Sequence, residues 1–306
     1  MSTSVITASQ RAGYRRARRR ETASAYALLI PSFIGVGVFL LLPVAVVIVL
    51  SFFQWNLLSA PTFVGLDHYR DLFRDARLLN SLWVTAKFTL MAIPTSIALG
   101  LLLAIALNRK LPGTKMMRVL YVLPWVCAPL ALGVVWRWIF DPSTGALNTI
   151  LGRRIEWMSD PHLALPAVAF VSVWSTVGYI SLFFLAGLQQ IPEQVYEAAR
   201  IDGAGPVRML FSITIPLLMP TMFFVTVTSV ISSFQVFDLV YGLTGSASGY
   251  PFGSTDVIAA RIYQEAFVTN HIGAASAIAV CLFIVLVAIT VIQQRFFSGK
   301  ITYDMS

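Results

Sequence analysis

Six long apolar runs divide this chain, and they constrain its fold more than any other feature. Each could cross the roughly 30 Å hydrocarbon core of a bilayer, which takes about 20 helical residues. The predicted spans are about Tyr26–Phe52, Leu82–Leu107, Val119–Ile139, Leu163–Leu188, Ile215–Phe237 and Ile272–Ile292. Only 12% of residues are charged and the mean hydropathy is +0.77, which is too apolar for a soluble domain of 306 residues.

These runs predict an all-α membrane protein. Strands of a membrane barrel would alternate apolar and polar residues over about ten positions, and the runs here are longer and unbroken. Prolines fall inside several runs. Membrane helices tolerate proline because neighbouring groups satisfy the freed carbonyls, so we expect these prolines to mark kinks rather than helix ends.

The positions of Lys and Arg predict the orientation of the chain. The stretch "RAGYRRARRR" carries six arginines before the first span. With six crossings, fourteen Lys and Arg fall on that side and seven on the other, so both termini are expected in the cytoplasm. We predict a basic cytoplasmic N-terminal tail (1–25), a six-helix transmembrane domain (26–294) and a cytoplasmic C-terminal tail (295–306).

The sequence offers no evident catalytic chemistry. It lacks the glycine-rich phosphate loop and the H-E-x-x-H zinc motif, and its three histidines are isolated in predicted outer loops. An enzyme, a metal site and a nucleic-acid partner are therefore not expected. Charge within the spans is also scarce, with Lys87 and Asp238 near their ends. An ion-coupled carrier usually needs ionisable groups near the midplane, so any transport should draw its energy from another source.

One short polar segment, residues 191–216, interrupts the apolar pattern between spans four and five. Residues 192–202 are expected to form a helix that begins at Pro192 and ends at Gly203. At about 1.5 Å per residue this helix is too short to cross a bilayer. Pro206 can start a second helix that continues into the fifth span. The segment therefore predicts a cytoplasmic helix-turn-helix joined to a membrane helix.

Within this segment stands "EAARIDG", followed by "ITIP". This pattern resembles the EAA loop of bacterial ABC importer permeases, which work with an extracellular binding protein. The family usually has Leu before the final proline, where this chain has Ile215. Further stretches, "FVGLDHYRDLF", "YVLPW" and "FQVFDLVYGLTG", resemble the carbohydrate branch of the family, of maltose, lactose and glycerol-phosphate type and similar to the larger maltose subunit. The stretch "TGSASGYPFGST" departs from the family's usual Gly-Gly-Pro turn.

The resemblance implies how such a chain would work. The short helix would dock on a cytoplasmic ABC ATPase dimer, which would hold the ATP and Mg, so no cofactor is expected in this chain. The resemblance assigns ATPase coupling to Glu197, Ala198, Ala199, Asp202, Gly203, Ile213 and Pro216. It further implies a second permease subunit, an extracytoplasmic substrate-binding protein, a sugar substrate and a multi-pass location in the bacterial inner (cytoplasmic) membrane.

Hydroxyl side chains recur at helical spacing in two spans. The predicted substrate path consists of Ser172, Ser175, Thr176 and Tyr179 in the fourth span and Ser229, Ser232 and Ser233 in the fifth. They could bind a sugar, with Trp174 and Phe234 available for stacking. Small hydroxyl residues also line ordinary helix contacts in membranes, so that alternative stays open.

Three function classes follow from these observations. The favoured class is a permease subunit of an ATP-driven, binding-protein-dependent sugar importer, which couples to a separate ATPase and forms half of the translocation path by alternating access. A second is an ABC importer permease for another solute, such as a polyamine or phosphate. A third is an ion-coupled secondary carrier.

Overall fold

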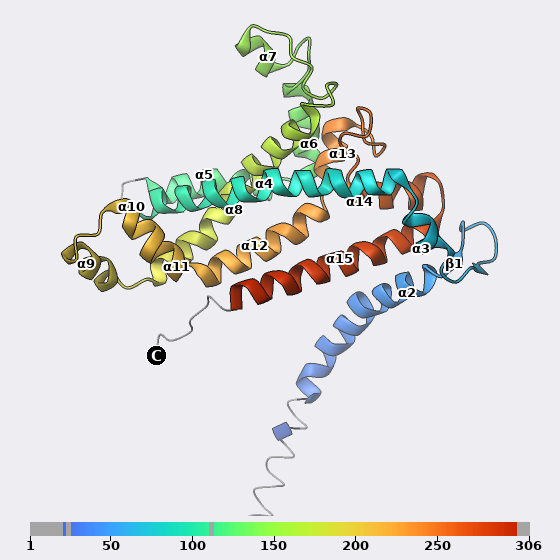
Figure 1. Ribbon diagram of the computed structural model, residues 1–306, viewed down its shortest axis with the longest axis horizontal. Coiled ribbons are helices and arrows are strands. Elements are labelled where there is room, and N and C mark those ends of the chain that lie inside the picture. Colours follow the sequence, from blue (N-terminus) through green and yellow to red (C-terminus); the bar gives the residue numbers. More distant parts are fainter. Residues whose placement is uncertain (1–20, 23–25, 110–112, 299–306) are drawn as a thin grey trace, which may run out of the picture.

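The protein is a helical bundle with one short two-stranded sheet (Figure 1). The computed structural model describes residues 21–22, 26–109 and 113–298. Most of the predicted tails, 1–25 and 295–306, lies outside the described residues. In the sheet, β1 pairs antiparallel with β2, with Phe53 opposite Phe63.

The elements follow one another in a simple order. The first half of the described chain contains η1 (Gly37–Leu41), α2 (Leu42–Leu50), β1 (Phe53–Gln54), β2 (Thr62–Phe63), α3 (Asp67–Leu72), α4 (Ala76–Asn108), α5 (Thr114–Val126), α6 (Pro129–Ile139), α7 (Ala146–Leu151) and α8 (Ala164–Gln190). The second half contains α9 (Glu193–Ile201), α10 (Pro206–Met209), η2 (Leu210–Thr214), α11 (Ile215–Leu217), α12 (Met219–Phe234), α13 (Asp238–Thr244), α14 (Ile258–Tyr263), η3 (Gln264–Val268) and α15 (Ile272–Ser298). The η elements are π-helical turns.

Four described helices are long and apolar enough to cross a membrane: Tyr26–Leu50, Ala76–Asn108, Ala164–Gln190 and Ile272–Phe297. Two further candidates are bent pairs. Helices α5 and α6 meet at 95°, and the segment Pro206–Leu217 meets α12 at 71°. The described part of the chain therefore has four candidate spans, or up to six if each bent pair counts as one.

The bent pairs correct the expectation that proline would only kink the spans. Pro94 does lie inside the unbroken α4. Between α5 and α6, however, Cys127 and Ala128 take extended backbone angles, so the helix ends and restarts at Pro129. Proline disfavours a helical conformation in the residue before it, which explains the extended Ala128. The predicted third span is thus two helices at an angle rather than one kinked helix.

The core lies where α8 crosses α4 and α12 (Figure 1). Phe88 of α4 and Phe184 of α8 are fully buried. Glycines allow the close approach of helices here: a Cβ at Gly178 of α8 would collide with the backbone of Tyr121 in α5. The tight packing of α8 against α4 and α5 holds the helices that position the candidate site.

The first candidate span stands apart from this core. No residue of Tyr26–Leu50 is buried, although α2 runs beside α15. Figure 1 shows this segment extending away from the bundle. Lipid or a second protein must cover its apolar surface.

Candidate functional site

A cavity of about 380 Å³ lies between α4, α8 and α12, near the break between α5 and α6. All seven residues of the predicted substrate path line it. Its lining comprises Phe88, Ala92, Ile93, Ser96, Trp125, Pro129, Ser172, Ser175, Thr176, Tyr179, Ile180, Phe183, Val225, Thr228, Ser229, Ser232, Ser233, Gln235, Val236, Phe237, Asp238 and Leu239. The fold thus brings together hydroxyl groups of two helices that are about 50 residues apart in the sequence.

Hydrogen bonding separates the seven residues into two groups. The hydroxyls of Ser175 and Thr176 both donate to the carbonyl of Ser172, at 2.9 and 2.8 Å. The hydroxyl of Ser233 donates to the carbonyl of Val230 at 2.8 Å. Bonds of this kind within one helix use the hydroxyl hydrogen. These three side chains therefore line the cavity without a free donor.

The second group keeps free hydrogen-bonding capacity. Within the described residues, the side-chain oxygens of Ser172, Tyr179, Ser229 and Ser232 have no hydrogen-bond partner. Each hydroxyl can donate one hydrogen and accept others. These four groups are therefore available to a polar solute in the cavity.

The aromatic side chains at the cavity differ from those expected. Trp125 of α5 stacks on Tyr179 of α8, with ring centroids 4.0 Å apart and planes 5° apart. Phe183 meets Tyr179 edge-on at 4.9 Å. By contrast, Trp174 packs against Trp136, and Phe234 is buried in a separate core cluster with Leu72 and Ile278. The prediction that Trp174 and Phe234 flank the substrate path is wrong, because tertiary packing turns both elsewhere.

Several lining residues were missed by the sequence reasoning. Thr228 lies four residues before Ser232, and Gln235 three after it, so the helical period of α12 already held a signal for both. Trp125 and Ser96 carried no such signal, since they come from helices that the path prediction did not include. For Asp238, the sequence indicates only a charge at the end of a predicted span.

The polar segment at 191–216 folds as a short helix, a turn and a second helix. Helix α9 spans Glu193–Ile201, within a residue of the expected limits. Gly203 takes φ +75°, and its N–H donates to the carbonyl of Arg200 at 3.1 Å. The N–H of Ala204 donates to the carbonyl of Ala199 at 2.9 Å, which completes a Schellman cap. The turn therefore requires a left-handed residue at 203.

The predicted coupling residues occupy different environments in this segment. Glu197, Ala198 and Asp202 are exposed, as is Pro216 in α11. Ile213 in η2 is half-buried, and Ala199 is only 7% exposed because it packs within this chain. Ile201, which the sequence reasoning did not single out, is 87% exposed beside the turn. The free surface of α9 thus carries a carboxylate next to small and apolar side chains.

Helix α9 is also tied to the start of the next candidate span. The hydroxyls of Tyr196 and Thr214 lie 3.3 Å apart, and the Thr214 hydroxyl bonds to the carbonyl of Met209 at 3.2 Å. Displacement of α9 would therefore pull on η2 and α11. This linkage suits the transmission of a movement from α9 to the membrane helices.

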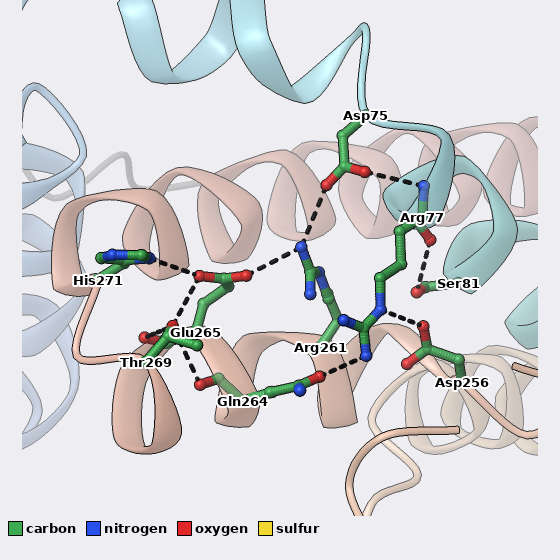
Figure 2. Close-up of polar contacts among 9 residues, drawn as sticks. All are labelled: Asp75, Arg77, Ser81, Asp256, Arg261, Gln264, Glu265, Thr269 and His271. Carbon is green, nitrogen blue, oxygen red and sulfur yellow. Dashed lines mark hydrogen bonds and ion pairs between the residues drawn. The ribbon is translucent and has the colours of Figure 1, made fainter. Parts of the chain in front are cut away.

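An ionic cluster lies at the opposite end of α4 from α9 (Figures 1 and 2). Arg77 contacts Asp256 at 3.5 Å and donates to Gln264 at 2.7 Å. Arg261 bridges Asp75 at 3.2 Å and Glu265 at 2.9 Å. The cluster fastens the start of α4 to the α14 and η3 segment, about 180 residues further along the chain.

Asp256 is the most buried member of this cluster, at 1% exposure. Its burial raises the pKa of the carboxyl group above the usual value of 3.8, against the opposing charge of Arg77. His271 adds a contact of 3.1 Å to Glu265. This cluster is thus partly desolvated, and its net charge depends on pH through the protonation of Asp256.

Comparison with known proteins identifies the family. Residues 96–303 match the family described as binding-protein-dependent transport system inner membrane component. The chain belongs to this family of transporter membrane subunits, which are not enzymes, and the resemblance inferred from the EAA pattern is confirmed.

Individual relatives cover most of both chains. The sn-glycerol-3-phosphate permease protein UgpA of Agrobacterium fabrum is 36% identical over 245 residues, covering 79% of this chain and 83% of the relative. The sulfoquinovosyl glycerol permease protein SmoG of the same organism is 33% identical over 279 residues, covering 89% and 90%. The probable ABC transporter permease YurN of Bacillus subtilis is 33% identical over 285 residues, covering 90% and 96%.

A solved structure shares the fold. A chain of a bacterial ABC transporter that imports the acidic polysaccharide alginate superposes with a TM-score of 0.76 at 21% identity, covering 94% of this chain and 99% of that one. A chain of a bacterial alginate ABC transporter solved in complex with an alginate pentasaccharide-bound periplasmic protein also shares the fold, with a TM-score of 0.74 at 20% identity. The present fold is therefore that of an ABC importer permease.

Proposed function

We propose that this chain is a permease subunit of an ATP-driven, binding-protein-dependent sugar importer. The observation that carries the proposal is the cavity between α8 and α12, where seven hydroxyl side chains predicted from the sequence converge. One of them, Tyr179, contacts the rings of Trp125 and Phe183. Hydroxyls that donate and accept, together with aromatic faces, suit the alternating polar and apolar surface of a sugar. The solutes named for UgpA, SmoG and the alginate importer support a polyhydroxylated solute, whereas the charge of the solute has to be inferred from the residues of this cavity.

The membrane topology belongs to the proposal. Each bent pair counts as one span, which gives six spans with both termini in the cytoplasm of a bacterium, in its inner membrane. This places α9 in the cytoplasm and the Arg77–Asp256 cluster outside. The distribution of Lys and Arg supports this orientation.

The proposal includes three protein partners, and two of them would cover exposed surfaces of this chain. A cytoplasmic ABC ATPase dimer, which holds the ATP and Mg, contacts α9 through Glu197 and the small and apolar side chains Ala198 and Ile201. A second permease covers the unburied Tyr26–Leu50 helix and completes the path. An extracytoplasmic binding protein delivers the sugar, as the periplasmic protein in complex with the alginate transporter suggests.

The proposal is tested with the four-component transporter in proteoliposomes, using two glycines of one turn as a matched pair. Gly203 has φ +75°, whereas Gly205 has φ −70°, and a Cβ at either position would meet no neighbour. Gly203→Val should therefore distort the turn by backbone strain alone, while Gly205→Val should not. Glu197→Lys reverses the charge of the exposed face.

We expect Gly203→Val and Glu197→Lys to lower sugar-stimulated ATP hydrolysis at least tenfold or to detach the ATPase, with Gly205→Val within twofold of the wild type. Equal activity of all three variants would contradict the coupling role of α9. Sugar uptake that needs an ion gradient but no ATPase would instead identify a secondary carrier, and ATP-driven uptake of a polyamine or phosphate would identify the other solute class.

A further inference from the structure

The charges of the cavity bear on which sugars it accepts. Among the described residues that line the cavity, Asp238 is the one charged side chain, and none is Lys, Arg or His. It stands where α12 has ended and α13 begins, in the first turn of α13. A solute in the cavity therefore meets a single fixed negative charge.

Asp238 has no partner that would neutralise this charge. Among the described residues, its carboxylate forms no ion pair and accepts no hydrogen bond, and the residue is exposed to the cavity. The guanidinium group of Arg137 lies beside Gly245, at the other end of α13. An unpaired carboxylate has free lone pairs for donors on a solute.

The surroundings strengthen the field of this carboxylate. The remaining walls are apolar or carry uncharged hydroxyl and amide groups, so they screen the charge less than water does. A cavity of one sign with apolar walls repels solutes of the same sign. Sugar hydroxyls, in contrast, can donate charge-assisted hydrogen bonds to the carboxylate, and these are stronger than bonds between neutral groups.

We propose that Asp238 is a specificity-determining residue that makes this cavity select neutral sugars or polyols and reject anionic ones, such as phosphorylated sugars and uronic acids. This inference rests on the proposed function, because it refines the substrate class of the same cavity. It sets this chain apart from permeases for anions, such as UgpA, named for sn-glycerol 3-phosphate, and the importer of the acidic polysaccharide alginate. Gln235 and Ser232, which also line this cavity, offer uncharged partners for further hydroxyls.

The test measures binding to the membrane complex of this chain, its second permease and the ATPase, without the binding protein, so that the cavity's own selectivity is observed. The probes are neutral disaccharides and glycerol on one side, and sn-glycerol 3-phosphate and glucuronate on the other. Asp238→Asn removes the charge with almost no change in shape. Asp71→Asn, at an exposed aspartate outside the cavity, is the matched control.

In the wild type and in Asp71→Asn we expect a neutral sugar to bind and the anions to bind at least tenfold more weakly. Asp238→Asn should weaken the neutral sugar about tenfold and strengthen the anions at least fivefold. The gain for anions is the diagnostic result, because a fold defect would weaken both classes. Asp238→Glu, which restores the charge, should again reject the anions.

Unchanged selectivity in Asp238→Asn, or a wild-type complex that binds the anions as tightly as the neutral sugars, would overturn the inference. Uptake by the complete transporter separates this failure from a failure of the proposed function. ATP-driven import of an anionic sugar would overturn the proposed role of Asp238 in rejecting anions, while the importer function would stand. Absence of ATP-driven import of any sugar would overturn the proposed function, and with it the proposed role of Asp238.

Discussion

At the scale of single residues, the cavity hydroxyls are not equivalent. Ser229 and Ser232 present free hydroxyls, whereas the hydroxyl of Ser175 is bonded to its own helix. One net hydrogen bond is worth about 0.5–1.5 kcal/mol, or roughly two- to twelvefold in affinity. We therefore predict that Ser229→Ala and Ser232→Ala each raise the KM for sugar uptake by about that factor.

Ser175→Ala is the control for this prediction, since it removes a hydroxyl from the same cavity wall without removing a free donor. Its KM should stay within twofold of the wild type. If all three alanine variants behave alike, the hydroxyls serve helix packing, which is the alternative that the sequence left open.

Asp256 permits a prediction about pH. Burial raises the pKa of its carboxyl in the folded protein, so between 3.8 and the raised value the folded state holds a proton that the unfolded state has lost. Its contribution to stability must then fall as pH rises through that window. The melting temperature of the wild-type complex, relative to Asp256→Asn, should therefore decline from pH 4 towards neutrality. A relative increase would mean that the Arg77 contact outweighs the cost of burial.

At the scale of elements, α6 and α13 meet through two glycines. A Cβ at Gly242 would lie 2.6 Å from the carbonyl oxygen of Leu130 and 2.9 Å from the Cα of Gly133. Backbone atoms cannot yield as a flexible side chain can. Helix α13 also begins with Asp238, so this contact helps to place the cavity's charge.

We predict that Gly242→Val separates α6 from α13 and destabilises the complex by about 1–3 kcal/mol, as overpacking generally does. Thermal unfolding followed by the fluorescence of the tryptophans would measure this. Gly242→Ala should show a smaller loss in the same direction. A wild-type melting temperature in Gly242→Val would show that the two helices can move apart freely.

At the scale of the whole molecule, the proposed topology places the two ends of α4 on opposite sides of the membrane. Asp71, before α4, should face outside, and Arg208, in α10, should face the cytoplasm; both are exposed. In a background with Cys127 and Cys281 replaced by serine and alanine, we predict that Asp71→Cys reacts with a membrane-impermeant maleimide in intact spheroplasts. Arg208→Cys should react only after permeabilisation. The reverse pattern would invert the orientation, and equal reactivity in intact spheroplasts would contradict an odd number of crossings between the two sites.

Local features of the chain were largely predictable. Apolar run lengths located the candidate spans, and Pro206 and Gly203 marked the helix start and the left-handed turn of the polar segment. The helical period placed Ser172, Ser175, Thr176 and Tyr179 on one face, and all four line the cavity. These properties depend on residues within a few turns of one another, which a sequence displays directly.

The sequence by itself therefore determined that this is a helical membrane protein of the importer permease family, with a short polar helix-turn-helix and two hydroxyl stripes. Only the tertiary structure decided that the stripes share a cavity, that Trp125 and Asp238 join them, and that Arg77 meets Asp256 across 179 positions. It also decided that the predicted third span breaks at Cys127 and Ala128 rather than continuing as one kinked helix. Periodicity and capping act locally along the chain, whereas these features depend on which helices lie side by side, and that is determined by the packing of distant segments.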